Sequence, residues 1–96
     1  MRRTEALAAL RRLFPLLSVR YGVTGVALFG SVARDQARPG SDVDVLVDLA
    51  APLSYFDLAD MQNALTDGLG ANVDLVPRAH MRADIMREIE NDLVGI

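Results

Sequence analysis

The segment "DVDVLVD", residues 42–48, restricts the fold of this chain more than any other part of the sequence. Its valines and its acidic residues alternate strictly, and a period of two residues is typical of a β-strand. One face of this strand carries Val43, Val45 and Val47, and the other carries Asp42, Asp44, Leu46 and Asp48. The segment therefore predicts a strand with one apolar face and one face that presents carboxylates.

The segment before this strand predicts a helix, a second strand and a short helical turn. Apolar residues recur at helical spacing after Thr4, the expected N-cap, and Gly22 is the expected end of this helix. We expect Pro15 to kink or restart the helix, because proline removes a backbone donor. "VTGVALFG" then predicts a buried strand that ends in a glycine turn, and "ARDQARPGS" predicts a helical turn followed by a loop.

The segment after residue 48 predicts two further helices with a strand between them. Ser54 is the expected N-cap of the first, with Gly68 and Gly70 as its stop signals. "NVDLVP" predicts a third short strand, and "RADIMREIENDLV" predicts a last helix with His80 in its first turn. The order of elements predicts a mixed α/β (α+β) fold, in which helices flank a small mixed β-sheet. At 96 residues, we expect residues 1–96 to form a single domain.

Composition excludes several kinds of chemistry. The chain has no cysteine, which rules out thiolate catalysis and cysteine-ligated zinc, and its one histidine cannot form a two-histidine metal site. Ten arginines stand against thirteen acidic residues, giving a net charge of −3, so we expect no direct nucleic-acid binding. No segment has the apolar length of a membrane span, and we expect a cytoplasmic protein that does not contact membranes.

Two carboxylates of the alternating strand are placed to share an ion. Residues two apart on a strand project to the same side, about 6.5 to 7 Å apart along the backbone, as Asp42 and Asp44 do. If the "NVDLVP" strand lies beside them, Asp74 joins the same face. Two like charges about 4 Å apart repel by about 4 kcal/mol at an effective dielectric of about 20. This repulsion is a large fraction of the total free energy of unfolding of a small domain, which is roughly 5 to 15 kcal/mol. The cluster therefore needs a cation or shifted protonation, and hard oxygen ligands favour Mg²⁺ or Mn²⁺.

The turn formed by Gly30 and Ser31 is a candidate phosphate site. A glycine between a strand and a helical turn lets backbone N–H groups approach an anion. A phosphate held there, beside divalent ions held by carboxylates, is the arrangement that moves a phosphoryl or nucleotidyl group. Neither of the common phosphate-loop motifs is present in the chain.

These features together resemble a known family. "GS" at residues 30–31, ten intervening residues, "DVD" at 42–44 and the "VDLV" strand with Asp74 form a joint pattern. The pattern resembles the signature of the DNA polymerase β-like nucleotidyltransferase superfamily. The whole chain resembles the minimal nucleotidyltransferase (MNT) members of that superfamily, over nearly all of its residues.

The resemblance implies a polymerase β-like fold and a nucleotidyl transfer assisted by two metal ions, Mg²⁺ or Mn²⁺, with ATP as substrate. It implies that Asp42 and Asp44 bind both ions, and that Asp74 completes the catalytic ion site and helps activate the acceptor hydroxyl. Gly30 and Ser31 would bind the β- and γ-phosphates. Arg34 has two equal interpretations, a phosphate ligand or a surface partner of Asp35 or Asp48.

The resemblance also implies a partner. Many MNT proteins are antitoxins encoded beside a HEPN ribonuclease toxin, which they neutralise by transferring AMP from ATP to a tyrosine of the toxin. A HEPN-type toxin is therefore the expected acceptor, in a hetero-oligomer with this chain. The alternative is an antitoxin that masks its toxin by binding alone. Transfer to a small molecule or RNA is disfavoured, because the chain is short for a second substrate pocket and is acidic.

One residue departs from the family pattern. Family members commonly have glycine where this chain has Asp35, one helical turn after Ser31. We expect an exposed carboxylate there to repel a triphosphate by about 0.3 to 1 kcal/mol. For Asp42 and Asp44, the alternative to a metal site is a solvated strand start that forms an Asx-type turn after Pro39 and Gly40.

Overall fold

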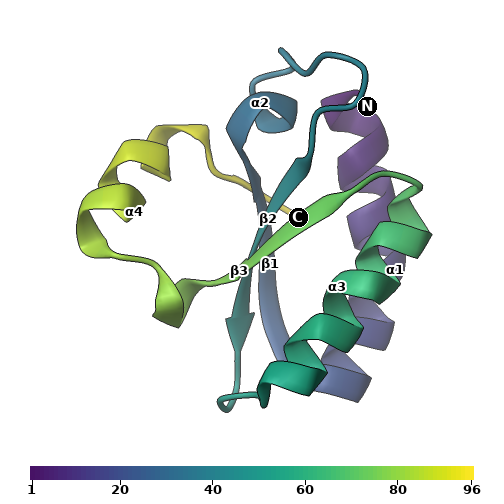
Figure 1. Cartoon of the computed structure of the whole chain (residues 1–96), viewed down its shortest axis with the longest axis vertical. Helices are drawn as coiled ribbons and strands as arrows, with labels where there is room; N and C mark the ends of the chain where they lie inside the picture. The colour runs from purple at the N-terminus through teal and green to yellow at the C-terminus, as the bar shows by residue number, and fades with distance from the viewer.

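The structure is a computed structural model that describes residues 1–96, and it contains one four-stranded sheet between two helical layers (Figure 1). The elements, in chain order, are α1 (Arg3–Tyr21), β1 (Val23–Phe29), α2 (Gly30–Ala33), β2 (Val43–Leu49), α3 (Tyr55–Leu69), β3 (Val73–Pro77), a 3-10 turn (Arg78–His80), α4 (Ala83–Ile89), a second 3-10 turn (Glu90–Asp92) and β4 (Val94–Gly95). The strand order is β3-β2-β1-β4, with β2 parallel to β3 and β1 antiparallel to both of its neighbours. The predicted mixed α/β fold is confirmed.

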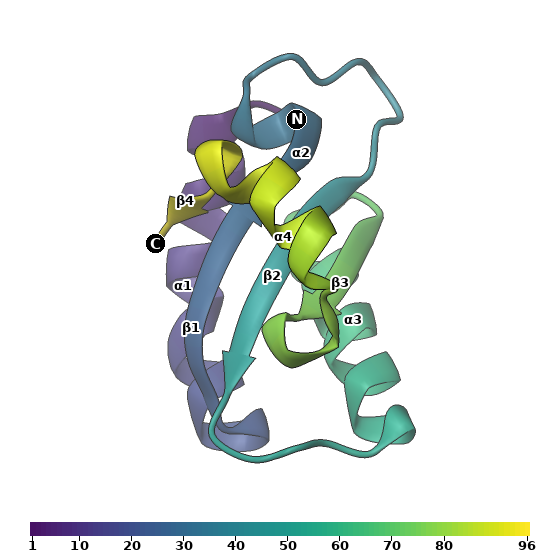
Figure 2. The same ribbon diagram turned by 90° about the vertical axis from the view of Figure 1, so that its left-hand side faces the viewer.

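The two faces of the sheet are covered by different helices. α1 and α3 pack side by side on one face, whereas α4 crosses the other (Figure 2). The valine face of β2 is completely buried in the main core with α1 and α3, as the alternation predicts. Leu46, on the opposite face, is also buried, in a smaller cluster with residues of α4. None of the helices is long and apolar enough to span a membrane.

α1 differs from the prediction at its start and at its proline. The helix begins at Arg3 rather than after Thr4, and the N–H of Arg3 is capped by the Asp35 carboxylate 3.1 Å away. The helix also continues through Pro15 without a break. An internal proline costs about 3 kcal/mol, and the burial of Leu10 and Leu17 on either side of it offsets that cost. Gly22 ends the helix at a φ of 72°, as predicted.

α3 begins as predicted, but one of its two glycines does not act as a stop signal. The Ser54 hydroxyl caps the helix by accepting the N–H of Asp57 at 3.1 Å, and Gly70 ends it. Gly68 lies inside the helix, where a Cβ atom would stand 2.6 Å from Cδ1 of Leu13. The absence of a side chain at Gly68 therefore lets α3 approach α1 closely.

The last helix is shorter than predicted. His80 lies in a 3-10 turn before α4 rather than in its first turn, and α4 ends at Ile89. The chain then turns back, and Val94 and Gly95 pair with β1 as a fourth strand that the sequence pattern did not indicate. This pairing satisfies backbone groups on the free edge of β1, which explains why the apolar residues after Ile89 do not continue the helix.

A buried tyrosine links the C-terminal end of α1 to the first half of α3. The hydroxyl of Tyr21 donates to Oδ2 of Asp60 at 2.5 Å, and Arg20 forms an ion pair with the same carboxylate at 3.1 Å. We expect Tyr21→Phe to lower the free energy of unfolding by about 1 to 2 kcal/mol, because one hydrogen bond to a charged group is lost while the ring stays packed. Chemical denaturation measures this change. Tyr55→Phe, at a ring that is 81% exposed, is the matched control and should leave stability unchanged.

Candidate active site

Three adjacent strands bring the predicted site residues into one row. Phe29, the residue before Gly30, pairs with Asp44 in the antiparallel register of β1 and β2. Asp44 in turn stands directly beside Asp74 in the parallel register of β2 and β3. The order across the sheet is therefore the glycine turn, the Asp44 carboxylate and the Asp74 carboxylate, with Asp42 just before β2.

Gly30 lies against the Asp44 side chain. Its φ is +76°, a left-handed conformation that glycine adopts without strain. A Cβ atom at this position would lie 3.0 Å from Cγ of Asp44 and closer still to its Oδ2. Both the backbone conformation and the contact therefore require glycine, and the start of α2 is held against the first carboxylate of the row.

The electrostatic environment of Asp44 is that of a crowded acidic site. Partial burial raises the pKa of the Asp44 carboxyl above its ordinary value, and the charges of Asp74 and Asp42 raise that pKa further. The guanidinium of Arg34 acts in the opposite direction. The charges of the other two predicted carboxylates thus reach Asp44 in the folded chain.

The donor set fits hard divalent cations. Asp42 and Asp74 are exposed and Asp44 is half-buried, so all three lie within reach of solvent ions. Carboxylate oxygens without histidine or cysteine are the ligands that Mg²⁺ and Mn²⁺ prefer. The side chains do not converge into a closed cluster with metal-binding geometry in this structure. Bringing the three carboxylates closer together requires a positive charge between them, because the pKa of Asp44 is already raised by burial and then by the charges of Asp74 and Asp42.

Comparison with known proteins identifies the family. Residues 5–96 match the model of the nucleotidyltransferase domain family. The chain belongs to this family. A provisionally assigned protein adenylyltransferase of Methanocaldococcus jannaschii is 35% identical over 97% of this chain and 96% of its own length. Protein adenylyltransferase MntA of Thermococcus cleftensis is 33% identical over 83% of this chain and 81% of its own length.

Solved structures have the same fold. A structure provisionally described as a minimal nucleotidyltransferase superposes with a TM-score of 0.81 at 32% identity, covering 100% of this chain and 97% of that one. An MNT antitoxin in complex with a tri-AMPylated HEPN toxin of Shewanella oneidensis superposes with a TM-score of 0.72. That match has 19% identity and covers 94% of this chain and 70% of the other, so it shows the fold alone.

Arg34 of this nucleotidyltransferase pairs with neither of the two residues considered from the sequence. Its Nη1 lies 2.9 Å from Oδ2 of Asp92, in the 3-10 turn that follows α4, and its Nε donates to Gln36. The positive charge of Arg34 also lowers the pKa of Asp44, although burial and the charges of Asp74 and Asp42 outweigh it. Asp92 was not found from the sequence, because it lies 58 residues from Arg34 and no local pattern connects them.

Asp35 has a structural role in the nucleotidyltransferase. Its φ is 59°, a left-handed conformation that glycine adopts without strain. The Asp35 carboxylate accepts the first N–H of α1, from Arg3, at 3.1 Å. The favourable interaction of a carboxylate with a helix N-terminus compensates for the backbone conformation that aspartate adopts here.

The pKa of Asp44 predicts how the metal-free protein responds to pH. Because this pKa is raised in the folded chain, Asp44 contributes fully to stability at pH values below 3.8, the ordinary pKa of an aspartate. The contribution is lost as the pH rises through the folded-state pKa. In a carboxyl-carbon NMR titration without metal, we expect the Asp44 midpoint above the ordinary value and higher still in Arg34→Ala. Arg38→Ala, on the loop before β2, should leave the midpoint unchanged, and a midpoint below the ordinary value would contradict the geometry.

A polar pocket adjoins the carboxylate row on the β3 side. It has a volume of about 500 Å³, and two of its lining residues are Asp42 and Asp74. Most of the remaining wall is formed by uncharged polar side chains, which are Gln62, Asn63 and Thr66 of α3 and Asn72 before β3. We call this cavity the amide pocket. No sequence pattern indicated these residues, because only the packing of α3 against the start of β3 brings them to the site.

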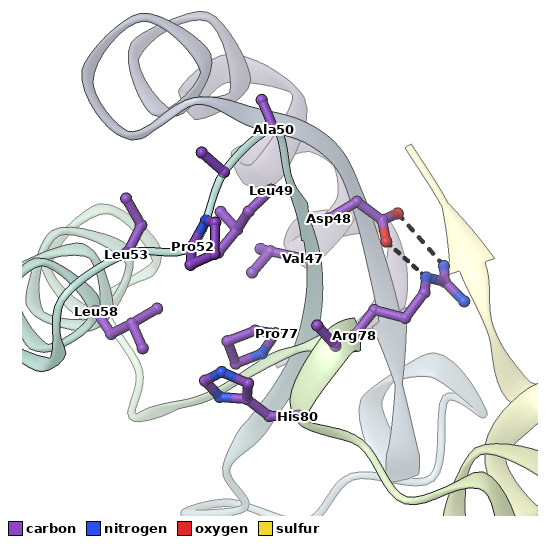
Figure 3. Close-up of a pocket in the computed structure, with 12 residues that line it drawn as sticks. Val47, Asp48, Leu49, Ala50, Pro52, Leu53, Leu58, Pro77, Arg78 and His80 are labelled. Carbon is purple, nitrogen blue, oxygen red and sulfur yellow. Dashed lines mark hydrogen bonds and ion pairs between the residues drawn. The ribbon is translucent and has the colours of Figure 1, made fainter.

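A second, more apolar pocket lies at the opposite end of β2 (Figure 3). Its volume is about 400 Å³, and it is lined by Val47 to Leu53, Leu58 and Pro77 to His80. The Asp48 carboxylate here is paired with Arg78, with Oδ1 and Nε 2.6 Å apart. Since its one carboxylate is neutralised and it contains neither the glycine turn nor the carboxylate row, this pocket is not part of the candidate active site.

Proposed function

We propose that this nucleotidyltransferase transfers AMP from ATP to a tyrosine hydroxyl of a HEPN-type toxin and thereby neutralises it. The observation that carries the proposal is the row formed by Gly30, Asp44 and Asp74 across three strands. The adenylyltransferase names of relatives that are 33% to 35% identical support AMP as the transferred group. The modified toxin in complex with an antitoxin of the same fold supports the acceptor class.

The row gives each residue a role. Asp42 and Asp44 would hold two divalent ions, and Asp74 would complete the site of the ion nearer the acceptor. These ions stabilise charge on the transferred group and make the acceptor oxygen more nucleophilic when bound. Backbone N–H groups of Gly30 and Ser31 would bind the β- and γ-phosphates. Arg34, whose charge already acts on Asp44, would add a positive charge beside the phosphates.

The bond changes follow from this arrangement. The tyrosine oxygen attacks the α-phosphorus of ATP, and the bond between that phosphorus and the oxygen bridging to the β-phosphate breaks. The products are a tyrosyl-AMP phosphodiester and pyrophosphate. The tyrosine proton passes to Asp74 or to a water molecule that it holds, and the pyrophosphate leaves on the Gly30 side.

Label transfer from ATP tests the proposal. The protein is incubated with Mg²⁺ and the HEPN partner encoded by the neighbouring gene, using ATP labelled at the α- or the γ-phosphate. We expect α-label on the partner, no γ-label, and no transfer by Asp42→Asn. Asp67→Asn, an exposed residue of α3, is the control and should behave as the wild type. A stable complex without label would instead favour an antitoxin that acts by masking alone.

A further inference from the structure

The amide pocket lies at the Asp74 end of the carboxylate row, at the β3 edge of the sheet. In-line displacement places the attacking oxygen opposite the leaving group. If the pyrophosphate leaves toward Gly30, attack comes from beyond Asp74. The amide pocket is lined by Asp74 and Asp42 but by no residue of β1 or α2, so it lies beyond the Asp74 end of the row, and its α3 wall lies on the side of the sheet that α1 and α3 cover. An acceptor that reaches Asp74 from the β3 edge passes this wall.

The chemistry of the pocket wall does not suit a phosphate. The two charged lining residues are both acidic, and the wall contains no arginine. Its other polar groups are side-chain amides and a hydroxyl, which pair with uncharged donors and acceptors. Peptide N–H and C=O groups are of this kind, and β3 is an edge strand, so the pocket is open to a large molecule.

We propose that the amide pocket binds the peptide segment that carries the acceptor hydroxyl, with Gln62 and Asn63 as the residues that recognise its backbone. Both side chains are exposed, and neither takes part in a side-chain hydrogen bond within the chain. Thr66 is not assigned to peptide recognition, because its hydroxyl already accepts a hydrogen bond from the N–H of Val73 at 3.3 Å. This inference rests on the proposed function.

Steady-state kinetics of the double variant Gln62→Ala/Asn63→Ala tests the inference, with the HEPN partner and ATP varied separately. We expect the KM for the partner to rise about tenfold, the scale of two lost hydrogen bonds between neutral groups. The KM for ATP and kcat at saturating partner should remain within about twofold of the wild type. Asp67→Ala, on the same helix outside the pocket, is the control and should change none of these constants.

Other results overturn the inference. A rise in the KM for ATP alone would show that the pocket holds the adenine base, and unchanged constants would show that it holds neither substrate. Calorimetric affinity for the partner without ATP separates this inference from the proposed function. If the wild type transfers no AMP but the double variant binds the partner more weakly, the proposed function fails, and the pocket is a binding site for the partner but not for an acceptor. Equal affinity, or no binding by the wild type, rejects the pocket assignment.

Discussion

Asp44→Asn should reduce the rate of AMP transfer by about 1,000-fold while making the metal-free protein more stable. A bound metal ion supplies several kcal/mol of transition-state stabilisation, and each 1.4 kcal/mol is a factor of about ten in rate. Asparagine keeps the shape of Asp44 but removes a charge from the row. Because burial and the charges of Asp74 and Asp42 raise the Asp44 pKa, the ionised carboxylate is unfavourable at neutral pH without a cation.

Two measurements check this prediction. Transfer rates give the loss of activity, and thermal unfolding near pH 7, with and without Mg²⁺, gives the change in stability. We expect a higher Tm for Asp44→Asn than for the wild type in EDTA and a smaller rise on adding Mg²⁺. Asp48→Asn is the matched control on the same strand, where loss of the ion pair with Arg78 should lower the Tm slightly and leave transfer intact. A lower Tm for Asp44→Asn in EDTA would show that the carboxylate is stabilising.

Gly30→Ala should lower transfer by about 100-fold or more and destabilise the fold by about 1 to 3 kcal/mol. A left-handed non-glycine residue alone costs about 1 to 2 kcal/mol. At Gly30 the new Cβ also meets the Asp44 carboxylate, so the side chain or the start of α2 must move. A displacement of about 1 Å at a reacting centre costs on the order of 100-fold in rate.

A second glycine separates the two effects. Gly40 also has a positive φ, of +85°, but no atom lies within 4 Å of a Cβ built there. We therefore expect Gly40→Ala to lose stability through its backbone conformation and to keep its transfer activity. Denaturation and label transfer, measured on both variants, give the comparison. Equal activity losses in the two variants would mean that the contact between Gly30 and Asp44 has no catalytic importance.

Local patterns predicted those parts of the fold that depend on neighbouring residues. The alternation of residues 42–48 predicted β2 and its buried valines, and Ser54 and Gly70 predicted the ends of α3. The patterns failed where a distant contact decides the outcome. Thr4 does not begin α1, because Asp35 caps that helix from another part of the chain. Gly68 does not end α3, because its position is determined by the approach of α1.

The candidate site shows the same division. The sequence by itself determined the spacing of Gly30, Asp42 and Asp44, because the glycine turn and the start of β2 belong to one short, continuous segment. Only the tertiary structure decided that Asp74 stands beside Asp44, since a parallel register depends on how two strands pack rather than on either strand alone. The tertiary structure likewise decided the pairing of Arg34 with Asp92 and the formation of the amide pocket. Both depend on contacts between side chains far apart in the chain, which no local periodicity encodes.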